Sequence, residues 1–147
     1  MRESSELYPI YSQMLWQKVS LDITKLPKSN GKEYLVVTRD DFSEWPEAWV
    51  LSLASSELVA KFIHEEILTR HDCMEELVVD GGSENKGEVI ALGKKFVIKH
   101  IITSVYHSQV NGMIEHSHQP ITDALFKLCN SEIYKWTIHL NFVLWVD

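Results

Sequence analysis

The chain has 147 residues, of which 45% are hydrophobic and 24% are charged, and its formal net charge is -7 at pH 7. This length and composition predict one globular domain with a substantial core. The acidic balance argues against a free-standing nucleic-acid-binding domain, which is usually basic, but clustered carboxylates suit a site that binds cations. The chain contains no apolar run near the roughly 18 residues of a membrane span, and its acidic start is unlike a signal peptide.

The first predicted strand carries an unusual acid. Residues 1–15 show no clear periodicity, and we expect them to be a linker that leads into a domain spanning 16–147. From Trp16 onward, apolar Val19, Leu21 and Ile23 alternate with polar residues, as in a strand with one polar face. Asp22 lies on that polar face, although aspartate is depleted in strands.

Two further strands complete an antiparallel meander. The segment from Leu26 to Gly31 reads as a turn, because it ends in the strong hairpin signal Asn-Gly. Tyr34 to Thr38 forms the second strand and Trp45 to Leu53 the third. Pro46 indicates that the third strand lies at a sheet edge, where its missing N–H is tolerated.

Helices then alternate with strands. Ser55 caps a helix that ends near His71, and the apolar run Leu77 to Val79 predicts a strand buried on both faces. This strand stops at Asp80, which precedes a Gly-Gly turn. Ser83 is expected to cap a second helix, and Phe96 to Ile102 to form the fifth strand. Strands reached through helices add in parallel.

The last part of the chain is predicted to be helical. After a polar stretch, Ser104 to Pro120, a helix is expected from about Val110 to Leu128, with a kink or break at Pro120. A final helix runs from Ile133 to Asp147. The predicted fold class is therefore α/β, with a five-stranded mixed sheet of three antiparallel and two parallel strands flanked by helices.

Three carboxylates stand where strand or helix geometry would present them: Asp22, Asp80 and Glu115. If the strands of Asp22 and Asp80 are neighbours, the three acids can meet, and they could not all ionise together without cations. Oxygen ligands favour Mg2+ or Mn2+, and paired ions of this kind serve in-line phosphoryl displacement. With 21 acidic residues, three unrelated surface acids are the alternative. Asp40 and Asp41, in a turn-rich corner, are expected to form local hydrogen bonds.

The remaining candidate residues favour structural roles. Cys73 and Cys129 belong to no C-x-x-C motif, and we expect both to be reduced, buried thiols. His116 and His118 have H-x-H spacing, but no second Cys/His pair stands at a suitable distance, so no zinc site is predicted. Four tryptophans are expected in the core or at a dimer interface, namely Trp45, Trp49, Trp136 and Trp145.

Sequence words around the three acids resemble a known family. V-S-L-D-I-T, L-V-V-T-R-D-D-F-S-E-W-P-E-A, V-V-D-G-G-S-E-N-K and Y-H-S-Q-V-N-G-M-I-E occur in this order. Together they resemble the integrase catalytic core of gypsy-type LTR retrotransposons and retroviruses, from about Trp16 to Asp147. The resemblance implies a ribonuclease-H-like fold, truncated here in its last helix. It also implies that Asp22, Asp80 and Glu115 match the family's acidic triad and hold Mg2+ or Mn2+.

The same resemblance implies a function on DNA. The family trims the ends of element DNA and joins them to target DNA, so DNA is the expected partner, a homodimer through the core the expected assembly, and the nucleus the expected location. By the resemblance, DNA contacts fall on the active-site loop, at Tyr106, His107, Gln109 and Asn111. Lys99 could also contact the DNA backbone, or belong to a plain solvated face.

The chain departs from the family's pattern at two positions. Ser108 stands where the loop usually has proline, and His116 stands where arginine commonly follows the glutamate. The alternative to an active integrase core is therefore a catalytically silent or domesticated copy that keeps the fold. A structure-selective nuclease of the same fold would share the metal site and lack this loop.

Overall fold

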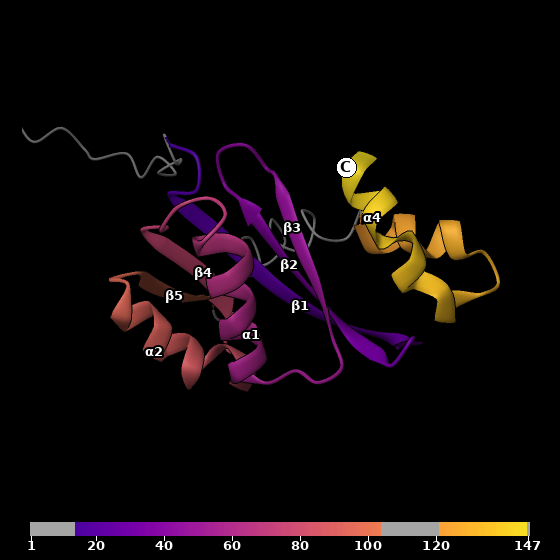
Figure 1. The fold of residues 1–147 in the computed structure, drawn as a ribbon, viewed down its shortest axis with the longest axis horizontal. Helices are drawn as coiled ribbons and strands as arrows, with labels where there is room; N and C mark the ends of the chain where they lie inside the picture. Colours follow the sequence, from indigo (N-terminus) through magenta and orange to yellow (C-terminus); the bar gives the residue numbers. More distant parts are fainter. Residues whose placement is uncertain (1–13, 104–120, 147) are drawn as a thin grey trace, which may run out of the picture.

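A computed structural model describes residues 14–103 and 121–146 (Figure 1). Five strands form one sheet in the order β3-β2-β1-β4-β5. Their bounds are Lys18–Ser29 (β1), Lys32–Asp40 (β2), Pro46–Leu51 (β3), Glu76–Asp80 (β4) and Lys99–Thr103 (β5). β1 to β3 pair antiparallel, whereas β4 runs parallel to β1 and β5 parallel to β4. The predicted mixed sheet, with β3 at an edge, is confirmed.

The β1–β2 hairpin turns at the Asn-Gly pair, as predicted. Asn30 and Gly31 have φ angles of 50° and 77°, the left-handed values that a two-residue type I′ turn requires. The rest of the predicted turn is instead strand, because β1 continues to Ser29 through an irregularity that follows Lys25. Pro27 lies in this irregular segment, where a missing N–H removes no regular ladder bond.

Helices cover both faces of the sheet. α1 (Ser56–Phe62), its π-helical continuation Ile63–Leu68, and α2 (Glu88–Lys95) pack on one face. The other face is covered by the helical segment 121–129, a 3-10 turn at Ile133–Lys135, and α4 (Trp136–Val146). The predicted Ser55 cap is present, since its Oγ accepts a hydrogen bond from the Leu58 N–H at 3.3 Å. No helix of the described ranges is long and apolar enough to span a membrane.

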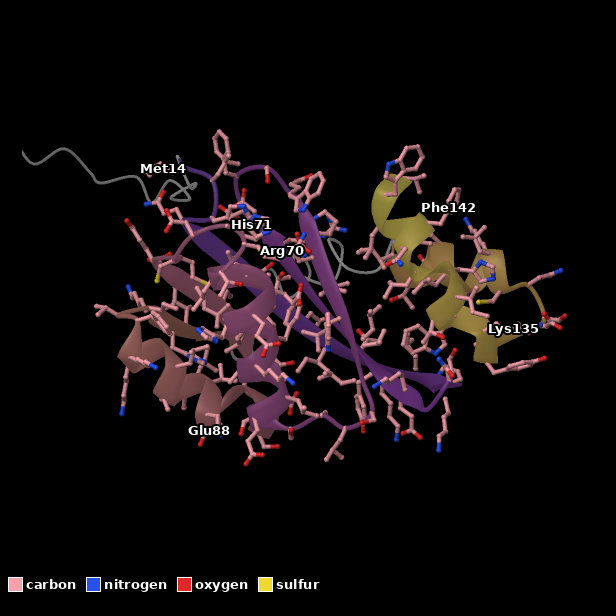
Figure 2. The ribbon with its side chains drawn as sticks, viewed as in Figure 1. Met14, Arg70, His71, Glu88, Lys135 and Phe142 are labelled. Atoms are coloured by element: carbon pink, nitrogen blue, oxygen red, sulfur yellow. The ribbon has the colours of Figure 1, made fainter. Side chains whose placement is uncertain are left out.

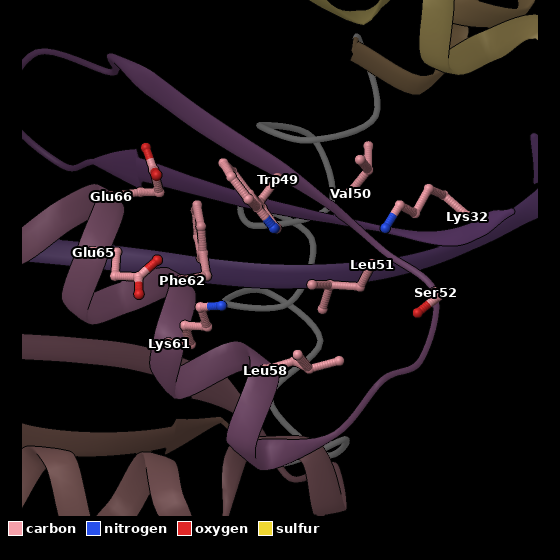
Figure 3. A pocket seen from close by; sticks show the side chains of 10 residues that line it. All are labelled: Lys32, Trp49, Val50, Leu51, Ser52, Leu58, Lys61, Phe62, Glu65 and Glu66. Atoms are coloured by element: carbon pink, nitrogen blue, oxygen red, sulfur yellow. The ribbon is translucent and has the colours of Figure 1, made fainter. Parts of the chain in front are cut away.

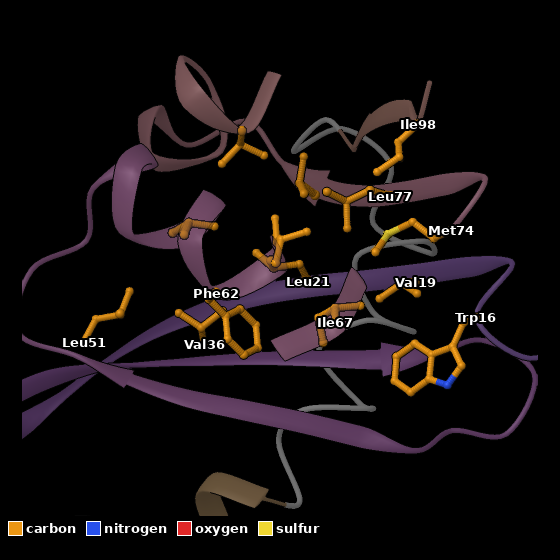
Figure 4. Packing of buried hydrophobic residues seen from close by; sticks show 14 residues of the cluster. Trp16, Val19, Leu21, Val36, Leu51, Phe62, Ile67, Met74, Leu77 and Ile98 are labelled. Carbon is orange, nitrogen blue, oxygen red and sulfur yellow. The ribbon is translucent and has the colours of Figure 1, made fainter. Parts of the chain in front are cut away.

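The sheet separates two hydrophobic cores. The first core joins alternate residues of β1, β2 and β4 to α1 and α2, and it includes Val19, Leu77 and Phe62 (Figure 4). The second core joins Leu35 and Val37 to the helices that follow residue 120. Because side chains alternate along a strand, each core marks one face of the sheet.

Trp136 is the largest side chain of the second core, and it is fully buried. Its Nε1–H donates to the carbonyl oxygen of Pro27, in the irregular part of β1. On the next residue, the Thr137 hydroxyl forms a 2.7 Å hydrogen bond with the hydroxyl of Ser29. The start of α4 is therefore fixed to the end of the β1–β2 hairpin. Trp136 is a core aromatic, as predicted, whereas Trp45, Trp49 and Trp145 are exposed in the described chain.

Asp40 has a structural role, as its place in a turn-rich corner predicted. Its buried carboxylate accepts hydrogen bonds from the Trp16 N–H at 2.8 Å, the Ser43 N–H at 3.0 Å and the Ser43 hydroxyl at 2.7 Å. These bonds satisfy a carboxylate that would otherwise be costly to bury. They also fix the entry to β1 against the β2–β3 corner.

The prediction of two buried cysteines is half right. Cys129 is buried in the second core, but Cys73 is exposed, because it stands in the loop that leads into β4. Partial burial and the nearby Asp72 carboxylate both raise the pKa of the Cys73 thiol. Burial, with a smaller contribution from Glu132, does the same for the pKa of Cys129. Both groups are therefore thiols at neutral pH.

The second helix begins later than predicted. Ser83 does not cap it; a 3-10 turn at Ser83–Asn85 comes first, and α2 starts at Glu88. Between them Gly87 has a φ of 50° and a ψ of -113°, a conformation that residues with a Cβ rarely adopt. The hydrogen bonds of the turn and this glycine, rather than a serine cap, set the start of the helix.

The fifth strand also begins later than predicted, at Lys99 rather than Phe96. The preceding residues close α2, since the Ile98 N–H donates to the Gly93 carbonyl at 2.7 Å and the Val97 N–H to Lys94 at 3.4 Å. This pair of bonds is a Schellman motif. Val97 occupies its left-handed position, with a φ of 56° and 87% exposure, where glycine is usual.

Val97→Gly should therefore stabilise the protein. The left-handed conformation is strained for a β-branched residue, and we expect a net gain of about 1 kcal/mol after the greater backbone freedom of glycine in the unfolded chain is subtracted. Urea denaturation of the two proteins measures this gain. Val97→Ala is the matched control, because it keeps the Cβ and should recover only part of the gain. A lower denaturation midpoint for Val97→Gly would contradict the assignment.

Candidate functional site

Asp22 lies in the middle of β1 on the face covered by α4. It pairs with Val37 of β2, which belongs to the second core, whereas its neighbours Leu21 and Ile23 pack in the first. Directly paired residues of neighbouring strands share a face. The carboxylate is therefore half-buried on the side of the sheet where residues 121–146 pack. β2 and β4 flank β1, which fixes its backbone.

Asp80 ends β4, the strand parallel to β1. The parallel register joins Lys18 to Glu76 and runs to Ser20 beside Val78. Asp22 and Asp80 each stand two residues beyond this last pair, so a continuation of the same register would set them side by side and on one face. Neighbouring strands lie about 4.8 Å apart, which is close enough for two carboxylates to share a cation. The convergence of these two acids stays a prediction, and the strand order, with β4 next to β1, meets the condition on which it depends.

The described residues donate hydrogen bonds to only one of the two Asp80 carboxylate oxygens. Oδ1 accepts hydrogen bonds from the Gly82 N–H and from Asn85 Nδ2, each at 2.9 Å. Oδ2 receives no hydrogen bond from the part of the chain that the structure describes, and the side chain is exposed. A carboxylate oxygen that the described residues leave without a donor can serve as a ligand of a hard divalent cation such as Mg2+.

Sequence reasoning missed the contact of Asn85 with Asp80. Asn85 follows Asp80 by five residues and lies in the 3-10 turn. Its side chain, however, is buried and reaches back to Asp80. The available signal was an amide shortly after a strand-end aspartate, across a Gly-Gly turn that brings the two together.

Glu115, Tyr106, His107, Gln109 and Asn111 lie outside the described residues. The ends of the undescribed stretch are nevertheless placed. It leaves the sheet at Thr103, which pairs with Asp80, and returns at Ile121, which is buried in the second core. Both ends therefore border the face that carries Asp22 and Asp80. Among the described residues, no three Asp, Glu, His or Cys side chains converge as a metal site.

Lys99 begins β5 and is distant from the two acids. It pairs with Glu76, which also pairs with Lys18, so opposite charges alternate across the first residues of three parallel strands. Thr103, at the level of Asp80, is four residues further along β5, or about 13 Å at the usual rise of a strand. The DNA contact suggested for Lys99 stays a prediction.

Two surface cavities in the described part of the chain lie away from Asp22 and Asp80. A cavity of about 230 Å³ separates β3 from α1, with Trp49 and Phe62 among its walls (Figure 3). A wider one of about 530 Å³ lies between β3 and α4 and includes Leu140. Both border the edge strand, which β2 separates from the strand of Asp22. Neither is lined by Asp22 or Asp80.

Arg70 and His71 follow the helical segment Ile63–Leu68, which continues α1 (Figure 2). His71 Nε2 is 3.0 Å from a Glu47 carboxylate oxygen, and Arg70 Nη1 is 3.7 Å from the other. The His71 ring stacks on Trp16, with 3.8 Å between ring centroids. These contacts tie the helical segment to β3 and to the entry of β1, which is a structural role.

Comparison with known proteins gives relatives of one kind. The chain is 30% identical over 125 residues to the retrovirus-related Pol polyprotein from transposon 412 of Drosophila melanogaster, a match that covers 84% of this chain and 10% of the relative. It is 30% identical over 128 residues to the Gag-Pol polyprotein of feline leukemia virus, covering 85% of this chain and 8% of that one. The chain thus spans a tenth or less of these curated relatives. No family model matches it.

A solved structure shares the fold. A chain from the simian T-cell lymphotropic virus intasome, in complex with the PP2A regulatory subunit B56 gamma, superposes with a TM-score of 0.78. The match covers 95% of this chain and 50% of that chain at 17% sequence identity. Together with the strand order, this likeness confirms the predicted ribonuclease-H-like architecture.

Proposed function

Because the chain belongs to the family of integrase cores found in the Pol polyproteins of LTR retrotransposons and retroviruses, we propose that it catalyses metal-dependent polynucleotidyl transfer on DNA. The observation that carries this proposal is the parallel register of β1 and β4, which pairs Ser20 with Val78 and, continued by two residues, would bring Asp22 beside Asp80. The proposal is further supported by Asp80 Oδ2, which accepts no hydrogen bond from the described residues and could therefore bind a cation.

The proposed site uses Asp22, Asp80 and Glu115 to hold Mg2+ or Mn2+. Such ions supply a Lewis acid for the scissile phosphate and lower the pKa of an attacking water or 3′-hydroxyl. The protein's own contribution is to hold the metal-binding carboxylates in fixed positions. Asp22 is fixed by strands on both sides, and Asp80 presents one oxygen while the other is hydrogen-bonded. Glu115 lies between the placed ends Thr103 and Ile121, which border the same face.

DNA is the proposed substrate, in two reactions. Trimming of element ends uses water as the nucleophile, and joining to target DNA uses the resulting 3′-hydroxyl. Tyr106, His107, Gln109 and Asn111 are the proposed DNA contacts of the intervening loop. The nucleus is the corresponding place of action. With a net charge of -7, bound cations would also reduce the repulsion between this acidic protein and DNA phosphates.

Disintegration of a branched DNA substrate by the purified chain tests the proposal. We expect strand cleavage and rejoining with Mg2+ or Mn2+, and none after EDTA treatment. Absence of any reaction with either ion would reject the active core. It would favour the second candidate, a silent copy that keeps the fold, for which Ser108 and His116 are the supporting observations.

A self-association surface is proposed on α4. Ile138, Phe142 and Trp145 form one stripe along this helix and are 72%, 55% and 82% exposed. Figure 2 shows Phe142 on the outer side of the helix. A contiguous apolar stripe of this kind typically marks an interface, and a homodimer through the core would bury it.

Phe142→Glu should weaken this dimer. Placing a charge at the centre of an apolar interface is expected to cost about 2 kcal/mol or more, which is roughly a thirtyfold rise in Kd. Sedimentation equilibrium measures the change. Asn141→Glu adds the same charge on the side of α4 that borders the cavity beside β3, and should leave the Kd nearly unchanged. Equal dissociation constants for Phe142→Glu and the native chain would contradict the interface.

A further inference from the structure

We infer that Asn85 is a positioning residue for the proposed metal site: its buried amide holds the Asp80 carboxylate so that Oδ2 faces the cation. This inference rests on the proposed function and adds to it a residue outside the acidic triad. Its basis is one hydrogen bond, from Asn85 Nδ2 to Asp80 Oδ1 at 2.9 Å.

Two donors act on the same oxygen of Asp80. The Gly82 N–H closes a local turn on Oδ1, and the Asn85 amide approaches that oxygen from the 3-10 turn. An exposed aspartate carboxylate otherwise rotates over a broad range about its last side-chain bond. With Oδ1 held twice, the carboxylate has one orientation and Oδ2 one direction.

The burial of Asn85 argues against a role in packing alone. The side chain is 1% exposed, and its own Oδ1 has no hydrogen-bond partner among the residues that the structure describes. A half-satisfied buried amide costs free energy that an apolar side chain of similar size would not. The reverse amide orientation would set two oxygens against each other at Asp80. Only the orientation present uses the amide as a donor, and that donor acts on Asp80 alone.

The local backbone explains how the amide reaches its target. The Asn85 N–H donates to the Gly82 carbonyl at 3.1 Å, and the Lys86 N–H to the Ser83 carbonyl at 3.2 Å. These bonds fold the segment after β4 back towards the end of the strand. Gly87 then lets the chain depart into α2. Asn85 is thus held by backbone bonds that do not depend on its side chain.

Asn85→Leu is the test, because leucine has a similar volume and no donor. We expect a thermal unfolding midpoint equal to or above that of the native chain, since the unpaired buried oxygen is removed. In the metal-free variant, the Asp80 side chain loses the hydrogen bond from Asn85. NMR three-bond Hα–Hβ couplings should then show its first side-chain torsion averaging among rotamers. Mn2+ affinity, measured without DNA by electron paramagnetic resonance, should fall about tenfold, as for other residues that orient metal ligands.

Thr103→Val is the matched control. It removes a neighbouring hydrogen bond, from the Thr103 hydroxyl to the Val79 carbonyl, and leaves in place the two hydrogen bonds that Asp80 Oδ1 accepts. Its Mn2+ affinity should equal that of the native chain. The inference is overturned if Asn85→Leu keeps a single Asp80 rotamer and native Mn2+ affinity. It is also overturned if the variant loses stability while affinity is unchanged, which is the result of a purely structural role.

Two further outcomes remain distinguishable. If Asn85→Leu does not fold, Asn85→Ser serves in its place, because the shorter hydroxyl cannot reach Asp80 and creates only a small cavity. If the native chain itself binds no Mn2+, the proposed function fails. The rotamer measurement needs no metal, and it then decides separately whether Asn85 holds Asp80.

Discussion

Asp22→Asn and Asp80→Asn should each lower the rate of metal-dependent DNA cleavage by about a thousandfold or more. Each substitution replaces an anionic ligand by a neutral amide, and loss of several kcal/mol of metal-based transition-state stabilisation corresponds to this factor. Because both acids are proposed ligands of the same metal site, we expect similar losses for both. Single-turnover disintegration with Mg2+ and Mn2+ measures the rates.

The fold should tolerate both changes. Asp80 is exposed and Asp22 half-buried, and the amides are close in shape to the carboxylates. Thermal unfolding midpoints should therefore stay at or above the native value. Asp41→Asn makes the same chemical change at an exposed corner, where the backbone bonds to Lys18 at the start of β1. This control should cleave at the native rate. Native rates for Asp80→Asn would sink the site assignment.

Trp136→Ala should lower the free energy of unfolding by about 3–5 kcal/mol, the usual cost of removing a large buried aromatic side chain. The side chain is fully buried at the centre of the second core. Its loss would leave a cavity under α4 and remove the hydrogen bond to Pro27 in β1. Denaturation followed by far-ultraviolet circular dichroism gives the free energy.

Tyr134→Ala is the control for this change. Tyr134 stands two residues earlier, is 57% exposed and contacts only the Lys135 side chain among ring contacts in the described chain. Its removal should change stability by about 0.5 kcal/mol or less. Hydrogen exchange adds a spatial test of Trp136→Ala. Protection should fall first in α4 and the segment 121–129, whereas β4 and α1, which belong to the other core, should keep theirs.

Periodicity predicted the sheet because each strand has a pattern that short-range physics explains. The alternation around Asp22, the apolar run before Asp80 and the Asn-Gly turn each imply a local structure without reference to the rest of the chain. The strand order then follows from short connections and helical crossovers. For the same reason, Asp22 could be assigned to a strand and Asp80 to a strand end, whereas their meeting was predicted only on the condition that the two strands are neighbours.

The errors arise where long-range or backbone-specific contacts decide. Val97 looks like a strand residue by composition, yet bonds to Gly93 and Lys94 place it in a helix cap. Ser83 is a good capping residue, but it begins a 3-10 turn instead, and Gly87 after this turn sets the helix start at Glu88. The hydrogen bond between Asn85 and Asp80 depends on the 3-10 turn and on Gly87. No pattern of hydrophobicity encodes it.

The division into two cores also sets an order of events during synthesis. A ribosome that has released residues up to Thr103 has delivered every strand, together with α1 and α2, and so the whole first core. The second core needs residues from 121 onward, and the proposed third ligand, Glu115, precedes them by only a short distance along the chain. Domains fold as their segments emerge. The nascent chain can therefore acquire its scaffold before the proposed metal site is complete.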